Sequence, residues 1–190
     1  MKSLTVWIFC FMSLSVAYGQ NNGLYLKVAY NGGMIINPGV SLGVGYSLLG
    51  GAQDQATLDN SYHELRIGIS TNYYFHQRLN KGLSLGPEVA WIRTSKKGFQ
   101  FGVVSNFGFL RTHIDNTFEV DDSGLLSKAK SSGNNHFFYD FGLRLGRTGR
   151  LDNQRMMEWY IQPKLQFQTP YFKQPNKYFL TEIGINYQIN

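Results

Sequence analysis

The chain of 190 residues is poor in cysteine, proline and charge, with one Cys, five Pro and 16% charged residues. The single cysteine, Cys10, excludes any disulfide within the chain. Beyond residue 20 no run approaches the roughly 18 apolar residues of a transmembrane helix. An apolar fraction of 43% excludes a disordered chain. Low charge beside 21 Gly and 15% aromatic residues is unusual for a soluble cytosolic domain.

The N-terminus has the three parts of a secretory signal. Lys2 supplies a positive charge, Leu4 to Val16 is apolar, and Ala17-Tyr18-Gly19 matches the small-x-small pattern of a signal peptidase site. The apolar run has about 13 residues, short of the roughly 20 that span a bilayer as a helix. The sequence predicts a signal peptide at 1–19, cleaved before Gln20, and one mature domain at 20–190 without cysteine.

After the signal, apolar residues alternate with polar or small ones, as in the run from Phe137 to Gly146. A strand can place such a period-two pattern on one face, whereas a helix cannot. Turn sequences such as Lys96-Lys97-Gly98 separate the segments. Two segments contain Pro87 and Pro163, where the sequence predicts bulges. The pattern recurs in eight segments, at 24–31, 38–49, 62–76, 82–95, 98–113, 136–147, 157–169 and 178–189.

Eight such segments predict an all-β fold, an eight-stranded antiparallel up-and-down transmembrane β-barrel. Glycines indicate which face lies inside. They share the polar face, where side chains crowd in the narrow interior of a small barrel. The opposite face is a band of large apolar side chains that favours lipid over water. A soluble barrel with an apolar interior is the competing interpretation. The glycines in question are Gly43, Gly45, Gly68, Gly86, Gly102, Gly108, Gly142, Gly146 and Gly184.

The signal, the alternating segments and the mature length resemble small outer-membrane β-barrels of Gram-negative bacteria, of the OmpA/OmpX-type architecture. The final segment, with Glu182, Gly184, Tyr187 and Ile189, is similar to the C-terminal signal read by the barrel-assembly machinery, although Asn190 follows it. The turn Pro170-Tyr171-Phe172 and the Tyr, Asn and Gln content resemble small barrels of the Bacteroidota. The resemblance implies a location in the outer membrane, among lipid and lipopolysaccharide, but no activity.

Charged residues collect on the face assigned to the lumen. Buried charges are costly unless paired, so the sequence predicts a closed network of ion pairs. An ion-conducting path lined by charges is the alternative. The predicted network comprises Lys27, Glu64, Arg66, Glu88, Asp140, Arg144, Lys164 and Glu182.

No motif indicates catalysis, a cofactor or a metal, and the compartment excludes nucleic acid. The nearest constellation surrounds the longest connection, where a His and carboxylates could orient a water or hold a metal. A solvated loop with ordinary polar residues is the simpler interpretation. The constellation comprises His113, Asp115, Asp121, Asp122 and His136.

Within that connection, Asp121-Asp122-Ser123-Gly124 is a turn sequence between short β-compatible runs. The sequence predicts a hairpin between the fifth and sixth barrel segments, presenting Phe118, Val120, Leu125 and Leu126 to a partner. If the mature N-terminus is periplasmic, this hairpin is extracellular. The predicted function is therefore a structural, binding or accessory role, with a larger outer-membrane complex as partner. A lipid-modifying enzyme or a narrow pore is the alternative.

Overall fold

The computed structural model describes residues 23–33, 38–49, 61–75, 80–114, 118–120, 124–128, 133–150, 156–169 and 176–189. The predicted signal peptide lies outside them. The strands are β1 (Leu24–Gly32), β2 (Gly39–Leu49), β3 (Tyr62–Phe75), β4 (Asn80–Thr94), β5 (Phe99–Ile114), β6 (Phe118–Val120), β7 (Leu126–Lys128), β8 (Gly133–Arg150), β9 (Met156–Thr169) and β10 (Asn176–Ile189). None of the described residues belongs to a helix long and apolar enough to cross a membrane.

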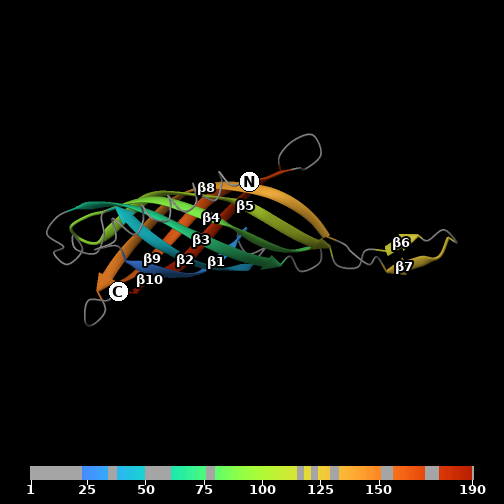
Figure 1. Cartoon of the computed structure of the whole chain (residues 1–190), viewed down its shortest axis with the longest axis horizontal. Coiled ribbons are helices and arrows are strands. Elements are labelled where there is room, and N and C mark those ends of the chain that lie inside the picture. The colour runs from blue at the N-terminus through green and yellow to red at the C-terminus, as the bar shows by residue number, and fades with distance from the viewer. Residues whose placement is uncertain are drawn as a thin grey trace, which may run out of the picture.

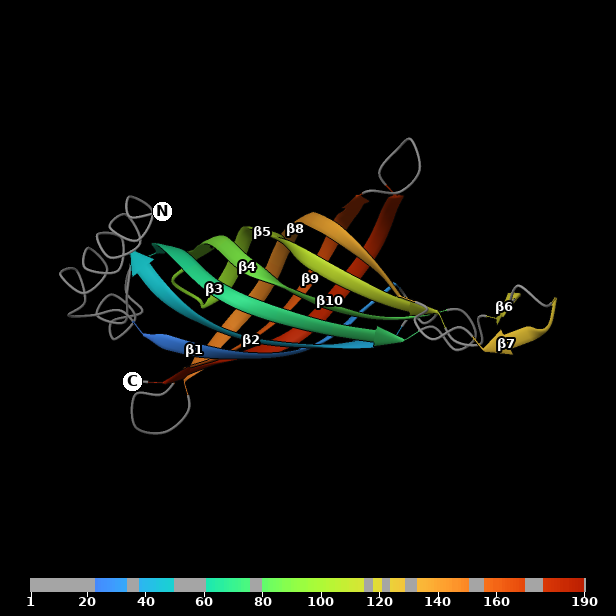
Figure 2. The ribbon, with the colours of Figure 1, turned by 45° about the vertical axis from the view of Figure 1, so that its right-hand side comes forward.

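Eight strands form one closed antiparallel barrel in the order β1-β10-β9-β8-β5-β4-β3-β2, which confirms the predicted fold class (Figure 1). The first and last strands close the wall, with Leu24 opposite Ile189 and Gly32 opposite Thr181. Figure 2 shows the strands running obliquely round the barrel, as closure of a sheet requires. The longest strand, β8, extends three residues beyond each end of its predicted segment.

The alternation predicted from sequence sets the two faces of the wall. In β1 the pattern of exposed and buried residues switches at every position from Leu24 to Asn31. Large apolar side chains point outward, such as Val28 at 57% and Phe109 at 75% exposed. An apolar surface of this extent suits a hydrocarbon environment. The apolar face therefore lies outside, and the interpretation as a soluble barrel is wrong.

Two predicted details differ from the structure. The pairing register is the same on both sides of Pro87 in β4–β5 and of Pro163 in β8–β9, so the predicted bulges are wrong. Each proline falls within a short gap in the pairing and leaves the strand alignment intact. A register shift occurs instead between β2 and β3, at Ser47 and Leu49.

The inner face also carries apolar residues that the sequence pattern did not single out. Ala90, Ile92 and Val104 form a small buried cluster between β4 and β5. Leu110 and Phe138 are each 1% exposed. The interior is therefore packed in part by hydrocarbon, and the charged residues occupy the space that remains.

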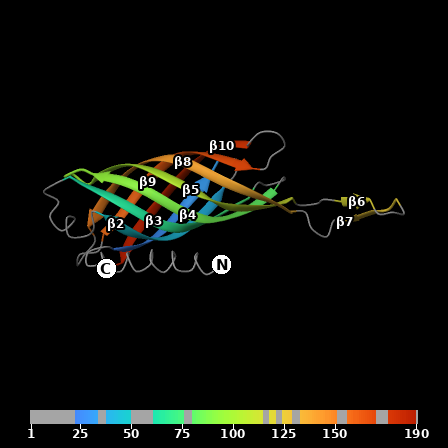
Figure 3. The same ribbon diagram turned by 45° about the horizontal axis from the view of Figure 1, so that its top comes forward.

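The predicted hairpin forms as a separate two-stranded sheet. Phe118 pairs with Lys128 and Val120 with Leu126, while Gly124 in the turn has φ of 81°. A positive φ is a conformation that glycine adopts at little cost. Figures 1 and 3 show β6 and β7 beyond one end of the barrel from two directions.

Candidate functional site

The structure places all eight charged residues of the predicted network on the inner face, each 3% exposed or less. Alternation within each strand is what turns these side chains inward. At this depth a charge without a partner would cost several kcal/mol. The contacts of these residues therefore decide what the lumen can do.

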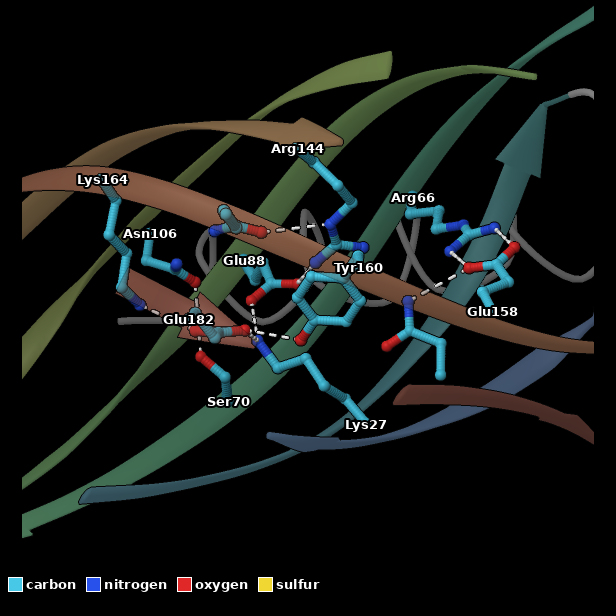
Figure 4. Close-up of polar contacts among 12 residues, drawn as sticks. Lys27, Arg66, Ser70, Glu88, Asn106, Arg144, Glu158, Tyr160, Lys164 and Glu182 are labelled. Atoms are coloured by element: carbon cyan, nitrogen blue, oxygen red, sulfur yellow. Dashed lines mark hydrogen bonds and ion pairs between the residues drawn. The ribbon is translucent and has the colours of Figure 1, made fainter. Parts of the chain in front are cut away.

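Six of these residues meet in the middle of the barrel, and we call them the central cluster (Figure 4): Lys27, Glu88, Asp140, Arg144, Lys164 and Glu182. Glu182 lies at its centre. Its carboxylate accepts a hydrogen bond from Lys164 Nζ at 2.8 Å and lies 3.3 Å from Lys27 Nζ. Lys27 also pairs with Glu88. Three positive and three negative groups balance the charge of the cluster.

Arg144 is held by three different kinds of contact. Its Nε donates to Gln162 Oε1 at 3.1 Å, and its Nη2 lies 3.8 Å from Glu88 Oε1. The guanidinium carbon lies 3.9 Å from the centre of the Tyr160 ring, within cation–π range. The Tyr160 hydroxyl in turn donates to Glu182 at 2.6 Å. Arg144 therefore contacts Glu88 directly and is connected to Glu182 through the Tyr160 side chain.

Neutral side chains complete the central cluster on the other side. Asn106 donates from its backbone N–H and its Nδ2 to Asp140 Oδ1, at 3.2 and 3.1 Å. The hydroxyl of Ser70 donates to Asn106 Oδ1 at 3.3 Å. Asp140 lies 3.9 Å from Lys164 Nζ. With these residues the network takes side chains from every barrel strand except β2, and it crosses the full width of the lumen.

A second group, the end cluster, lies toward the barrel end opposite the hairpin and comprises Arg66, Glu64, Glu158, Gln100 and Asn186. Figure 4 shows Arg66 and Glu158 set apart from the central cluster. Arg66 makes two hydrogen bonds to each of its carboxylate partners, at 2.5–2.7 Å. Gln100 and Asn186 donate to Glu158 at 2.9 and 3.2 Å. Paired forks of this kind are among the stronger polar contacts in proteins.

Glu158 is the main lumen residue that the sequence prediction missed. It lies within the predicted segment 157–169 and six residues before Lys164, so period-two alternation places both on one face. The signal was therefore available. With Glu158 the described lumen contains four positive and five negative side chains instead of four of each.

The residues of the predicted assembly signal line the closing seam of the barrel. Glu182 belongs to the central cluster, and Gly184 faces inward opposite Ala29. A Cβ added at Gly184 would lie 2.5 Å from that of Ala29 and 2.8 Å from the Tyr160 hydroxyl. Tyr187 and Ile189 lie on the outward-facing register of the same strand. Recognition by an assembly machinery stays a prediction.

The predicted His and carboxylate constellation does not come together in the described residues. His113 is exposed on the outer register of β5, whereas His136 is buried on the inner face of β8, 3.3 Å from the Thr112 hydroxyl. The barrel wall separates the two rings, since alternation sends odd and even positions to opposite sides. Asp115, Asp121 and Asp122 lie outside the described residues. Within the described ranges no three His, Cys, Asp or Glu side chains gather as metal ligands would.

The hairpin presents its apolar residues to solvent. Exposed fractions are 62% for Phe118, 68% for Val120 and Leu125, and 74% for Leu126. Each of its two strands pairs only with the other, so among the described strands each keeps one unpaired edge. Apolar side chains beside open strand edges are typical of surfaces that bind another protein.

Known proteins resemble this chain in structure and not in sequence. No family model and no curated protein matches it. The crystal structure of Neisserial surface protein A is similar with a TM-score of 0.51 and 9% identity, covering 88% of this chain and 94% of that one. The N-terminal β-barrel domain of Pseudomonas aeruginosa OprF gives 0.44 and 11%, covering 90% and 98%. The outer membrane enzyme PagL gives 0.40 and 13%, covering 87% and 99%.

The fold is that of the small outer-membrane β-barrels. This conclusion rests on the closed eight-stranded topology, the apolar outer surface and the likeness to Neisserial surface protein A. The comparisons give no support to an origin in the Bacteroidota. At 9% identity the likeness to Neisserial surface protein A carries the fold and not a function.

Proposed function

We propose that this protein is a bacterial outer-membrane barrel with a sealed lumen, which acts as a structural, binding or accessory component through the hairpin β6–β7. The observation that carries the proposal is the hairpin itself. Its four large apolar side chains are 62–74% exposed, and its two strands lie beyond one end of the barrel (Figure 1). Surfaces of this kind mark interaction sites in folded proteins.

The surroundings of the barrel follow from its outer surface. The apolar band suits the hydrocarbon of a bilayer, and the flanking head groups would be those of outer-membrane lipid and lipopolysaccharide. Export by a cleaved signal peptide and insertion by the barrel-assembly machinery are part of the proposal. The first is supported by the sequence of residues 1–19 and the second by that of the final strand.

The contents of the lumen favour a sealed barrel over a pore. The central cluster spans the barrel width with side chains that bond to one another, so ions would have to break those contacts to pass. The separation of His113 from His136 favours a binding role over an enzyme. Both arguments concern the described residues.

The occupant we propose for the hairpin is a protein that adds a strand to one of its edges, as part of a larger outer-membrane complex. Main-chain hydrogen bonds along the edge would supply affinity. Phe118 and Val120 are spaced two apart, so both side chains project from one face of β6 and could fill pockets on the partner.

Affinity purification from native membranes tests this function. The wild-type chain should co-purify with at least one stoichiometric protein. A variant with Phe118, Val120, Leu125 and Leu126 replaced by Ser should assemble but lose that protein. The matched control replaces Lys96 and Lys97 in the exposed turn between β4 and β5 by Ser, and it should retain the partner. A partner held equally by all three chains would overturn the role of the hairpin.

A further inference from the structure

A groove of about 420 Å³ lies on the outer face of the barrel, at the end opposite the hairpin. Small-molecule sites in proteins usually have roughly 300–1,000 Å³. The groove is open to the surface that faces lipid, so a bilayer component can enter it from the side. Its lining comprises Ser61, Arg93, Ser95, Phe99, Gln100, Phe101, Leu145 and Gly146.

The floor of the groove is apolar and leads toward the middle of the barrel. Phe101 on β5 lies opposite Leu145 on β8, and the two side chains are 48% and 50% exposed. Two residues further along the same strands, Val103 lies opposite Leu143, and both are exposed to a similar extent. The floor therefore has the length and direction of an acyl chain that runs from the bilayer surface into the hydrocarbon.

The mouth of the groove, at the barrel end, is polar. Arg93 is exposed on β4 beside Phe101, and Ser95 begins the turn to β5. A guanidinium group binds phosphate oxygens through paired N–H donors, and a serine hydroxyl can donate one more hydrogen bond. The mouth therefore carries the donors that a phosphate group needs, directly above an apolar floor.

Further positive charge surrounds the mouth. Arg147 lies next to the lining, with its guanidinium carbon 5.3 Å from the centre of the Phe99 ring. Lys96 and Lys97 are exposed in the turn itself. Basic side chains at this height attract anionic head groups.

The turn that forms the mouth is fixed by hydrogen bonds before any ligand binds. Ser95 N–H donates to Phe99 O at 2.8 Å, and Phe99 N–H donates to Ser95 Oγ at 3.1 Å. Thr148 N–H donates to Gly98 O at 2.8 Å, which ties the turn to β8. A site whose walls are ordered in advance loses less entropy when it binds.

We propose that this groove binds an anionic phospholipid of the surrounding bilayer. Its phosphate binds at Arg93 and Ser95, and one acyl chain lies on Phe101 and Leu145. The order of groups along the groove, from cation to hydrocarbon, is the order of phosphate and acyl chain along such a lipid. The inference rests on the bilayer setting of the proposed function and is independent of the hairpin and its partner.

Tryptophan quenching by brominated lipids tests the site. Trp91 and Trp159 are the only tryptophans after the predicted signal peptide. Trp91 is two residues from Arg93 on the same face of β4, and Trp159 lies opposite Arg147. The purified barrel is placed in phosphatidylcholine vesicles that contain a rising fraction of dibromo-phosphatidylglycerol or of dibromo-phosphatidylcholine. The anionic lipid should reach half-maximal quenching at a fraction about fivefold lower than the zwitterionic lipid.

Three variants locate the site. Arg93→Gln should reduce the preference for the anionic lipid about fivefold, to near equality. Arg111→Gln removes an exposed arginine from the outer face of β5 at the hairpin end, so it is the matched control and should keep the preference. Replacing Lys96 and Lys97 together by Ser removes more charge from the same rim, but it should reduce the preference less than Arg93→Gln. Heat-modified gel mobility checks that each variant is folded.

The possible failures are distinguishable. If dibromo-phosphatidylcholine does not quench the wild-type barrel at all, the bilayer setting is wrong and the lipid site is wrong with it. If it quenches as well as the anionic lipid, or if the preference survives Arg93→Gln, the groove is not a site for anionic lipid. A larger loss from the lysine pair than from Arg93→Gln would also overturn the site, since charge at the rim alone would then select the lipid.

Discussion

The guanidinium carbon of Arg144 lies 3.9 Å from the centre of the Tyr160 ring, inside a barrel whose wall of strands is closed. The two residues come from neighbouring strands, β8 and β9. Because the tyrosine hydroxyl donates to Glu182 at 2.6 Å, the ring connects a buried cation to a buried carboxylate. Removing the cation should therefore disturb the centre of the network.

Arg144→Leu should destabilise the barrel by about 3–5 kcal/mol, the usual cost of breaking a buried ion pair. The loss leaves Glu88 with fewer positive neighbours and Gln162 without its donor. The heat-modified gel shift should then occur at a lower temperature. Arg147→Leu is the control, because Arg147 is exposed on the outer face and should change little. An unfolding temperature equal to that of wild type for Arg144→Leu would mean that this cation is solvated.

Arg66→Leu should be more damaging than Glu64→Gln. The first change leaves two buried carboxylates, Glu64 and Glu158, without their common partner. The second leaves Arg66 bonded to Glu158, so only one charged contact is lost, worth about 1.5–3 kcal/mol. Urea unfolding of the refolded barrels gives the comparison. Equal losses of stability in the two variants would show that Arg66 does not stabilise the barrel through both carboxylates at once.

The final strand offers a way to separate packing from recognition by the assembly machinery. Gly184→Ala should destabilise the purified barrel by about 1–3 kcal/mol, because the added Cβ meets Ala29 and Tyr160. Tyr187→Ala should refold in detergent almost as wild type but reach the membrane in smaller amounts in cells. Normal membrane levels of Tyr187→Ala would remove this residue from the proposed assembly signal.

Protease added to intact cells tests the orientation. Extracellular loops of such barrels are usually longer than periplasmic turns. The connection from 115 to 132 is the longest in the barrel and carries the hairpin, so cleavage should fall between residues 114 and 135. The turn Lys96-Lys97-Gly98 at the other end should be cut only after the cells are opened. Cleavage of intact cells confined to residues 50–61 would reverse the orientation.

Much of the fold could be predicted from sequence, because period-two alternation and the glycines report which face a residue occupies. The same alternation correctly predicted that residues such as Lys27 and Glu182 face the lumen. It could not assign partners, since these depend on how strands are staggered round the barrel. Glu182, for example, contacts Lys27 and Lys164, which come from the two strands on either side of β10.

Other features were hidden from sequence for different reasons. Ile92 and Val104 interrupt the alternation of apolar and polar residues, so their inward positions could not be recognised from the pattern. A cavity in the lumen beside Asn31 is formed by residues from several strands that meet only when the barrel closes. By contrast, the hairpin was predictable because its turn residues and flanking runs are local in sequence.

The sealed lumen is tested most directly by single-channel recording of the purified wild-type barrel in planar bilayers. A wide-pore porin in the same bilayers serves as the positive control for insertion and detection. With the central and end clusters both intact, the barrel should show no steady conductance above that of the bare bilayer. A steady, reproducible conductance from the wild-type chain would contradict a sealed lumen and would favour the narrow pore.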